Sequence, residues 1–221
     1  MQLRAIVLVV AVLTGGVSAA SAAADVSPNG SDAVVAPARG GGLTGGQLLG
    51  EAWARANYSG APNPLNGSCE SVARDVIVAH YDDDFSARCQ ATQRTRLFLF
   101  FGTACFNVEE GVGETRQEQL ACAVRADEAI HELNVTVDGD ITDLVNRRFE
   151  LFSPQRTVQL PEPNGFGIPA QEVTFTAHGW GAVVRRLRPG RHIVTFEVVA
   201  PEWGEPTTFT IILDVVRSGA R

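Results

Sequence analysis

The spacing of apolar residues along the chain predicts a fold made mostly of short β-strands. Residues 76–78 and 97–101 are apolar runs of strand length, and the aromatic second run suits a central strand buried on both faces. Further apolar runs, separated by Pro, Gly and Asn, occupy residues 133–137, 149–151, 158–160, 173–175, 183–187, 193–199 and 209–216. Such a series predicts a mainly β fold, which we expect to be an antiparallel β-sandwich of the jelly-roll or Ig-like kind.

Two helices are predicted beside the strands. Residues 47–58 place apolar side chains on one helical face, which predicts a short N-terminal helix. Thr115 and Glu118 have the spacing of a capping box, and apolar residues then continue at helical intervals. We therefore expect one packed helix over residues 116–131 within the sandwich domain.

The first 24 residues have the features of a cleavable secretory signal peptide, with Arg4 ahead of a nine-residue apolar run and small residues near the end. Residues 25–46 are rich in Gly, Ser, Pro and Ala and are expected to form a flexible leader. A single domain should then span residues 47–217, followed by a tail at 218–221. No later apolar stretch reaches the roughly 18 residues of a transmembrane helix, so we expect a secreted protein without membrane insertion.

Composition narrows the classes of partner. The chain carries a formal charge of -7, which argues against nucleic acid and anionic membranes as partners. All 18 basic residues are arginine, and the absence of lysine excludes Schiff-base chemistry. An arginine-rich chain without lysine also favours a bacterial source with a GC-rich genome.

The cysteines are expected to form structural disulfides. Four cysteines allow three pairings, and we favour Cys69–Cys89 with Cys105–Cys122 because each bond closes a short loop. The second bond would also tie the aromatic strand to the predicted helix. No two cysteines stand two to four residues apart as in the usual zinc pairs, so a metal site or reactive thiols are the weaker alternative.

Two charged clusters are candidates for ligand binding. Asp82, Asp83 and Asp84 offer oxygen ligands for calcium but lack the glycine and distal glutamate of an EF-hand loop, so an exposed acidic turn is the simpler interpretation. Residues 185–191 carry four arginines, which suits a sulfated or phosphorylated ligand, although an exposed hairpin end at Pro189 also explains them. The histidines are scattered, and no protease, nucleophile-elbow or phosphate-loop motif occurs, so we assign no catalytic, metal or cofactor residue.

Several separated segments of residues 49–216 form a recognisable set. They include Gly67-Ser68-Cys69, Cys89, Cys105, Cys122 with Asp127, Val137-Asp138-Gly139, Gly179-Trp180, and Pro189-Gly190-Arg191-His192. With these segments the chain resembles a group of uncharacterised secreted bacterial β-rich proteins. In that group, Asp-Gly-Tyr-Trp precedes a Pro-Gly-x-His-x-Ile-x-Phe segment, whereas this chain has His178 in place of the Asp and a shortened Gly179-Trp180. The resemblance implies a β-rich extracytoplasmic protein and carries over no established activity.

These observations favour a non-enzymatic extracellular or cell-envelope binding module, with an extracellular protein or glycan as its partner. The alternative is a secreted hydrolase that acts on an envelope or environmental polymer through loop carboxylates. Paired carboxylates facing a concave pocket would favour the enzyme. A purely structural partner of another secreted protein is a third possibility, and an exposed apolar patch would favour it.

Overall fold

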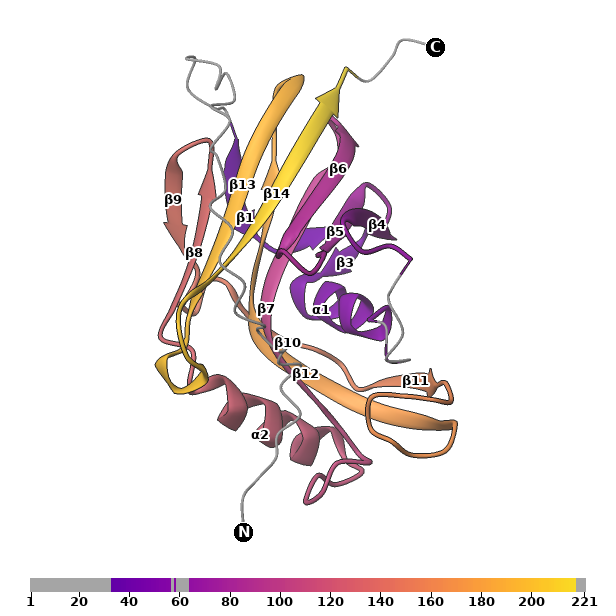
Figure 1. Cartoon of the computed structure of the whole chain (residues 1–221). Coiled ribbons are helices and arrows are strands. Elements are labelled where there is room, and N and C mark those ends of the chain that lie inside the picture. The colour runs from indigo at the N-terminus through magenta and orange to yellow at the C-terminus, as the bar shows by residue number, and fades with distance from the viewer. Residues whose placement is uncertain (1–32, 57, 59–63, 218–221) are drawn as a thin grey trace.

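Two β-sheets packed face to face form the body of the molecule, and two α-helices of the described chain lie against the first sheet (Figure 1). The computed structural model describes residues 33–56, 58 and 64–217. The predicted signal peptide, residues 1–24, and the tail, residues 218–221, lie outside these ranges. The elements are β1 (Val34–Pro37), β2 (Arg39–Gly40), β3 (Leu43–Thr44), α1 (Gly45–Ala54), β4 (Ser68–Ala73), β5 (Val76–His80), β6 (Ser86–Thr92), β7 (Arg96–Phe106), α2 (Arg116–Asp127), β8 (Glu132–Val137), β9 (Asp140–Asp143), β10 (Glu150–Phe152), β11 (Arg156–Leu160), β12 (Gln171–Arg185), β13 (Gly190–Val199), a 3-10 turn (Pro201–Trp203) and β14 (Thr207–Val216).

The strand order confirms a mainly β sandwich and corrects one detail of the prediction. The first sheet has the order β1-β12-β7-β5-β4, and the second has the order β6-β14-β13-β8-β9. Most pairs are antiparallel, but β5 runs parallel to β7 and β6 runs parallel to β14. The sheets are therefore mixed rather than purely antiparallel. For β5 and β7 the reason is the connection between them. The chain passes through β6 in the second sheet and returns to the first sheet in the direction that β5 had.

The first sheet is buried on both faces, which explains the aromatic character of β7. Leu97 and Leu99 of β7 pack with Val194 and Phe196 of β13 in the core between the sheets. Phe98 points the other way, into a second apolar cluster that includes the buried side of α1. The prediction of a central strand buried on both faces is confirmed.

Helix α1 begins at a capping box that fixes its first turn. The Thr44 side chain accepts a hydrogen bond from the Gln47 amide, and the Gln47 side chain in turn accepts one from the Thr44 amide. Leu48 and Leu49 follow and are fully buried against the first sheet. The predicted N-terminal helix is confirmed, with its bounds shifted to Gly45–Ala54.

Helix α2 begins at the predicted capping box of Thr115 and Glu118. It covers the lower part of β7 and β12, which extend beyond the second sheet (Figure 1). The helix ends at Asp127, earlier than predicted. Ala129 and Ile130 are buried where the chain turns into β8, so their apolar side chains belong to the turn rather than to a helical face.

The structure places the second half of the predicted leader in strands. Residues 34–37 form β1 and pair with residues 182–185 of β12. Residues 39–44 form the short β2–β3 hairpin that leads into α1. These segments contain few large apolar residues. They gain order from backbone pairing, β1 with β12 and β2 with β3, which composition does not reveal.

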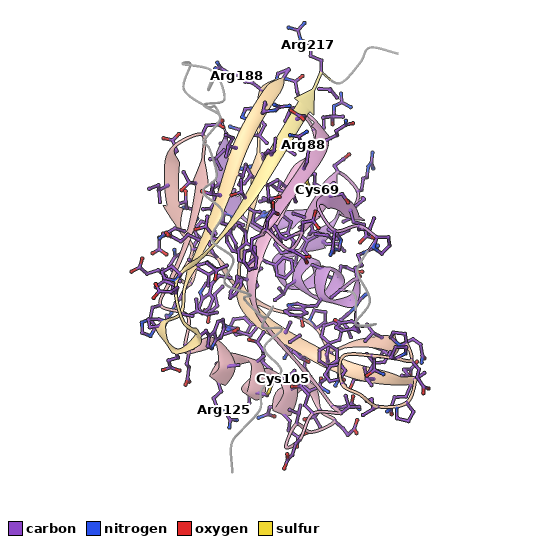
Figure 2. The ribbon with its side chains drawn as sticks, in the orientation of Figure 1. Cys69, Arg88, Cys105, Arg125, Arg188 and Arg217 are labelled. Atoms are coloured by element: carbon purple, nitrogen blue, oxygen red, sulfur yellow. A yellow bond between two sulfur atoms is a disulfide. The ribbon has the colours of Figure 1, made fainter. Side chains whose placement is uncertain are left out.

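Two disulfides join Cys69 to Cys89 and Cys105 to Cys122, the pairing favoured from the sequence. The first links β4 of the first sheet to β6 of the second, and the second links β7 to α2. Figure 2 shows Cys69 and Cys105 in different halves of the molecule. Disulfides of this kind indicate an oxidising environment.

The Pro189-Gly190 turn differs from the expected hairpin. It joins β12 of the first sheet to β13 of the second, and these two strands do not pair. The turn is thus a connection between sheets. Along the described ranges, none of the helices has the length and apolar character needed to cross a membrane.

Candidate functional site

A pocket of about 530 Å³ lies where the ends of β7 and β12 meet β1 and the β2–β3 hairpin. Val183 and Phe98 face the α1 side of the first sheet. Because side chains alternate along a strand, Arg185 and Arg96, two residues away from them, face the same side. Both arginines line the pocket, and Arg39 of the hairpin joins them.

The three arginines that line the pocket have no carboxylate partners among the described residues. The ladder between β12 and β7 reaches the pair Val184 and Leu97, so Arg185 and Arg96 occupy the next two facing positions. Facing like charges on neighbouring strands destabilise a sheet. None of the ion pairs between described residues involves Arg39, Arg96 or Arg185.

The Arg185 guanidinium also has a desolvated donor. Its Nε atom is buried and has no hydrogen-bond partner among the described residues. A buried donor of a charged group without an acceptor costs free energy, more than a neutral group would. The Arg185 guanidinium thus lines the pocket with one of its donors unsatisfied.

The β2–β3 hairpin approaches the first sheet closely because its turn is glycine. A Cβ on Gly41 would lie 2.8 Å from the backbone N and O of Arg74, and the Gly41 φ of +59° favours glycine as well. A Cβ on Gly40 would lie 2.5 Å from Val76 Cγ2 and 3.2 Å from Arg96 Cδ. Larger residues at these positions would displace the hairpin and change the shape of the pocket.

The chemistry of the pocket is that of an anion receptor. The guanidinium group presents several N–H donors in a planar fork that matches the oxygens of carboxylates, phosphates and sulfates. Asp75, whose backbone carbonyl accepts a hydrogen bond from the Arg96 amide, forms a loose ion pair with Arg74 at 3.9 Å and does not line the pocket. A local positive site thus occurs on a chain whose formal charge is -7.

A second polar cluster lies under α2, where His178 stands between two carboxylates. His178 Nδ1 is 2.7 Å from Asp127 Oδ2, and His178 Nε2 is 3.3 Å from Glu150 Oε1. Thr103 donates a 2.6 Å hydrogen bond to the other Asp127 oxygen. Since Asp127 and His178 are buried and come from α2 and β12, this cluster fixes the helix to the sheet.

The same geometry controls the protonation of the cluster. Burial lowers the pKa of His178, but the hydrogen bonds and negative charges of Asp127 and Glu150 outweigh it and raise the pKa. Burial raises the pKa of Asp127, and the hydrogen bonds from His178 and Thr103 oppose that shift only in part. Both shifts mean that the folded cluster holds its protons more tightly than the unfolded chain.

The acidic run lies in the turn between β5 and β6. The Asp82 amide donates to the Ser86 carbonyl, and the Asp84 side chain accepts from the Ser86 amide. The run therefore stabilises its own turn. Within residues 33–56, 58 and 64–217, no three His, Cys, Asp or Glu side chains are grouped so that they could hold a metal ion.

The structure divides the basic run at residues 185–191. Arg185 faces the pocket, whereas Arg191 forms a 2.9 Å ion pair with Asp214 of β14. Arg186 and Arg188 are exposed in the connection between the sheets. Sequence reasoning missed Arg39 and Arg96, and the glycine triplet after Arg39 was the one local signal that could have pointed to the hairpin.

Comparison with known proteins adds little to this description. No family model and no curated protein matches the chain. Among solved structures, the solution structure of amebosin is similar at 10% sequence identity and a TM-score of 0.23, and the match covers 64% of this chain and 96% of that chain. A likeness this weak carries no argument. The resemblance to secreted bacterial β-rich proteins stays a prediction.

Proposed function

We propose that this chain is a secreted, non-enzymatic binding module of the extracellular space or cell envelope, and that its arginine pocket holds an anionic group of the ligand. One observation carries the proposal: Arg39, Arg96 and Arg185 converge on one pocket without carboxylate partners in the described chain. A ligand anion would offset the repulsion among these arginines. The signal features of the first 24 residues and the two disulfides support an extracytoplasmic location.

The pocket favours binding over hydrolysis. A glycosidase-type hydrolase needs two carboxyl groups on opposite sides of the bond that it cleaves. The described lining of this pocket contains arginines, glycines and apolar residues instead. An extracellular protein or glycan that carries an anionic group fits this lining, and no specific observation favours the hydrolase.

The proposal is tested by thermal unfolding of the mature protein in the presence of anions. Phosphate, sulfate and citrate are compared with chloride at matched ionic strength, because a ligand that binds the folded state raises the Tm. These anions also stabilise folded proteins in general because they are excluded from the protein surface. We therefore expect a larger rise for the wild-type protein than for the double variant R96Q/R185Q.

Arg125→Gln serves as the matched control for lost charge. Arg125 lies on α2 and is not among the residues that line the pocket. Figure 2 shows it at the other end of the molecule from Arg188, which follows the pocket residue Arg185 in the chain. The Arg125→Gln variant should keep the wild-type response. Equal shifts in the wild-type protein and the double variant, or no shift with any anion, would contradict the proposal.

A further inference from the structure

We infer that the arginine pocket recognises a small organic phosphate or sulfate ester, with the ester oxyanion on the arginines and the organic group on the apolar wall. The inference rests on the proposed function and specifies the class of its ligand. It follows from the number of donors, their placement on separate segments, and the space left in the pocket.

The donors exceed what one carboxylate can accept. A carboxylate has two oxygens, and a single bidentate arginine occupies both of them. Here Arg96 and Arg185 stand side by side at adjoining strand ends, and Arg39 comes from a separate hairpin. A phosphate or sulfate monoester presents three terminal oxygens to separate donors, and a phosphate monoester carries a charge of about -1.5 to -2 at neutral pH. Such a group matches three guanidinium groups better than a single carboxylate does.

The buried Arg185 Nε strengthens this assignment. It lacks a partner among the described residues, and the neighbouring Val183 and Val184 are buried and supply no acceptor side chain. An oxyanion seated between Arg96 and Arg185 would meet the outer N–H groups of Arg185, and a shift of the guanidinium would then bring one of its oxygens to the buried Nε. The desolvation cost of the free protein would then be recovered on binding.

The pocket is larger than a bare ion requires. Its volume of about 530 Å³ falls in the range typical of pockets for small organic molecules. Ala36, Pro37, Leu43 and Val183 supply an apolar wall beside the arginines. The organic part of the ester, of about the size of one sugar or aromatic ring, can pack on this wall while its charged end meets the arginines.

The test is calorimetric titration with four probes: phenyl phosphate, phenyl sulfate, benzoate and inorganic phosphate. We expect at least one phenyl ester to bind about tenfold tighter than benzoate, because it engages donors that a carboxylate leaves unpaired. Inorganic phosphate should bind more weakly than phenyl phosphate because it lacks the apolar part. The preferred ester identifies whether the natural ligand is phosphorylated or sulfated.

Variants separate the parts of the site. Arg96→Gln should weaken binding of the preferred ester about tenfold because it removes one of the charged donors. Arg185→Lys should weaken it about tenfold as well, because lysine keeps the charge but loses the planar fork. Leu43→Ala should weaken binding of the phenyl ester and leave inorganic phosphate unchanged. Arg125→Gln is the charge control, and a circular dichroism spectrum like that of the wild-type protein confirms that each variant is folded.

The outcomes distinguish the inference from the proposed function. Benzoate that binds as tightly as the phenyl esters would overturn the ester inference and leave an anion-binding module in place. Heparin is titrated as a fifth probe. If heparin binds in a way that needs Arg96 while the small esters do not bind, the inference is overturned in favour of an extended polyanion. An absence of response to every anion would overturn both.

Discussion

Gly102 and Gly179 face each other across the ladder between β7 and β12. On β7, the preceding Phe101 packs against the core between the two sheets, and the following Thr103 contacts Asp127 of α2. A Cβ on Gly102 would lie 2.2 Å from the His178 carbonyl oxygen, and one on Gly179 would lie 2.2 Å from the Phe101 carbonyl oxygen. These distances are far below van der Waals contact. Therefore only glycine fits at these two positions while β7 and β12 keep their spacing.

Gly179→Ala should lower the free energy of unfolding by about 3 kcal/mol, because the added methyl group must push two backbone strands apart. Urea unfolding followed by fluorescence measures the effect. Gly165→Ala is the control, since a Cβ there would lie 3.9 Å from its nearest neighbour, the Tyr58 carbonyl oxygen. A Gly179→Ala protein as stable as the control would show that the strands relax without cost.

The His178 cluster makes stability depend on pH. The pKa of His178 in the folded state is raised above its usual 6.5, so its contribution is fully present below that pH and is lost as the pH rises through the folded-state value. The free energy of unfolding should therefore fall as the pH rises above the usual histidine pKa of 6.5, and it should fall less in His178→Asn. His131→Asn, at an exposed position, is the control. Identical pH profiles for the wild-type protein and His178→Asn would refute this account.

At the scale of elements, local side-chain contacts fix where helix α2 begins. The Thr115 hydroxyl accepts from the Glu118 amide at 3.3 Å, and Glu118 Oε2 accepts from the Thr115 amide at 3.1 Å. The hydrogen bonds from the Thr115 side chain and backbone hold the pKa of Glu118 below its usual range. Both interactions satisfy amides that the helix itself leaves unpaired.

Thr115→Ala should destabilise the protein by about 1 kcal/mol through loss of this cap. Thr115→Ser keeps the hydroxyl and should stay close to wild type. Chemical denaturation of the three proteins at one pH gives the comparison. If Ser and Ala destabilise equally, the lost methyl group rather than the cap is responsible.

Elements that rest on local signals were predictable from the sequence, and those that rest on distant pairing were not. The α2 capping box and the aromatic β7 run each predict their element from a segment of about ten residues. Strand β1 has four residues and exists because it pairs with β12, about 150 positions later. The same reason hid the pocket, because its arginines at positions 39, 96 and 185 meet only after the sheet has formed.

At the scale of the whole molecule, the disulfides join layers that are otherwise held by packing. Cys69–Cys89 crosslinks the two sheets, and Cys105–Cys122 crosslinks α2 to the first sheet. The bonds close loops with sequence separations of 20 and 17 residues. Each therefore restricts the unfolded chain to a similar degree.

Replacing either cysteine pair by serine should lower the free energy of unfolding by about 3 kcal/mol, and reduction of the wild-type protein should give roughly the sum. Denaturation in the presence and absence of dithiothreitol measures both effects. If the reduced wild-type protein matches the oxidised one, the crosslinks are not a source of stability.

One edge of β12 is shared by three short strands, β1, β10 and β11, which come from separate parts of the chain. A fifteen-residue strand left open there would present a long row of unpaired amides and carbonyls on which a second molecule could add a strand. Division of that edge into pieces of three to five residues leaves no long continuous template for such growth. We therefore expect the three short strands to protect this edge against strand addition by a second molecule, even in concentrated solution.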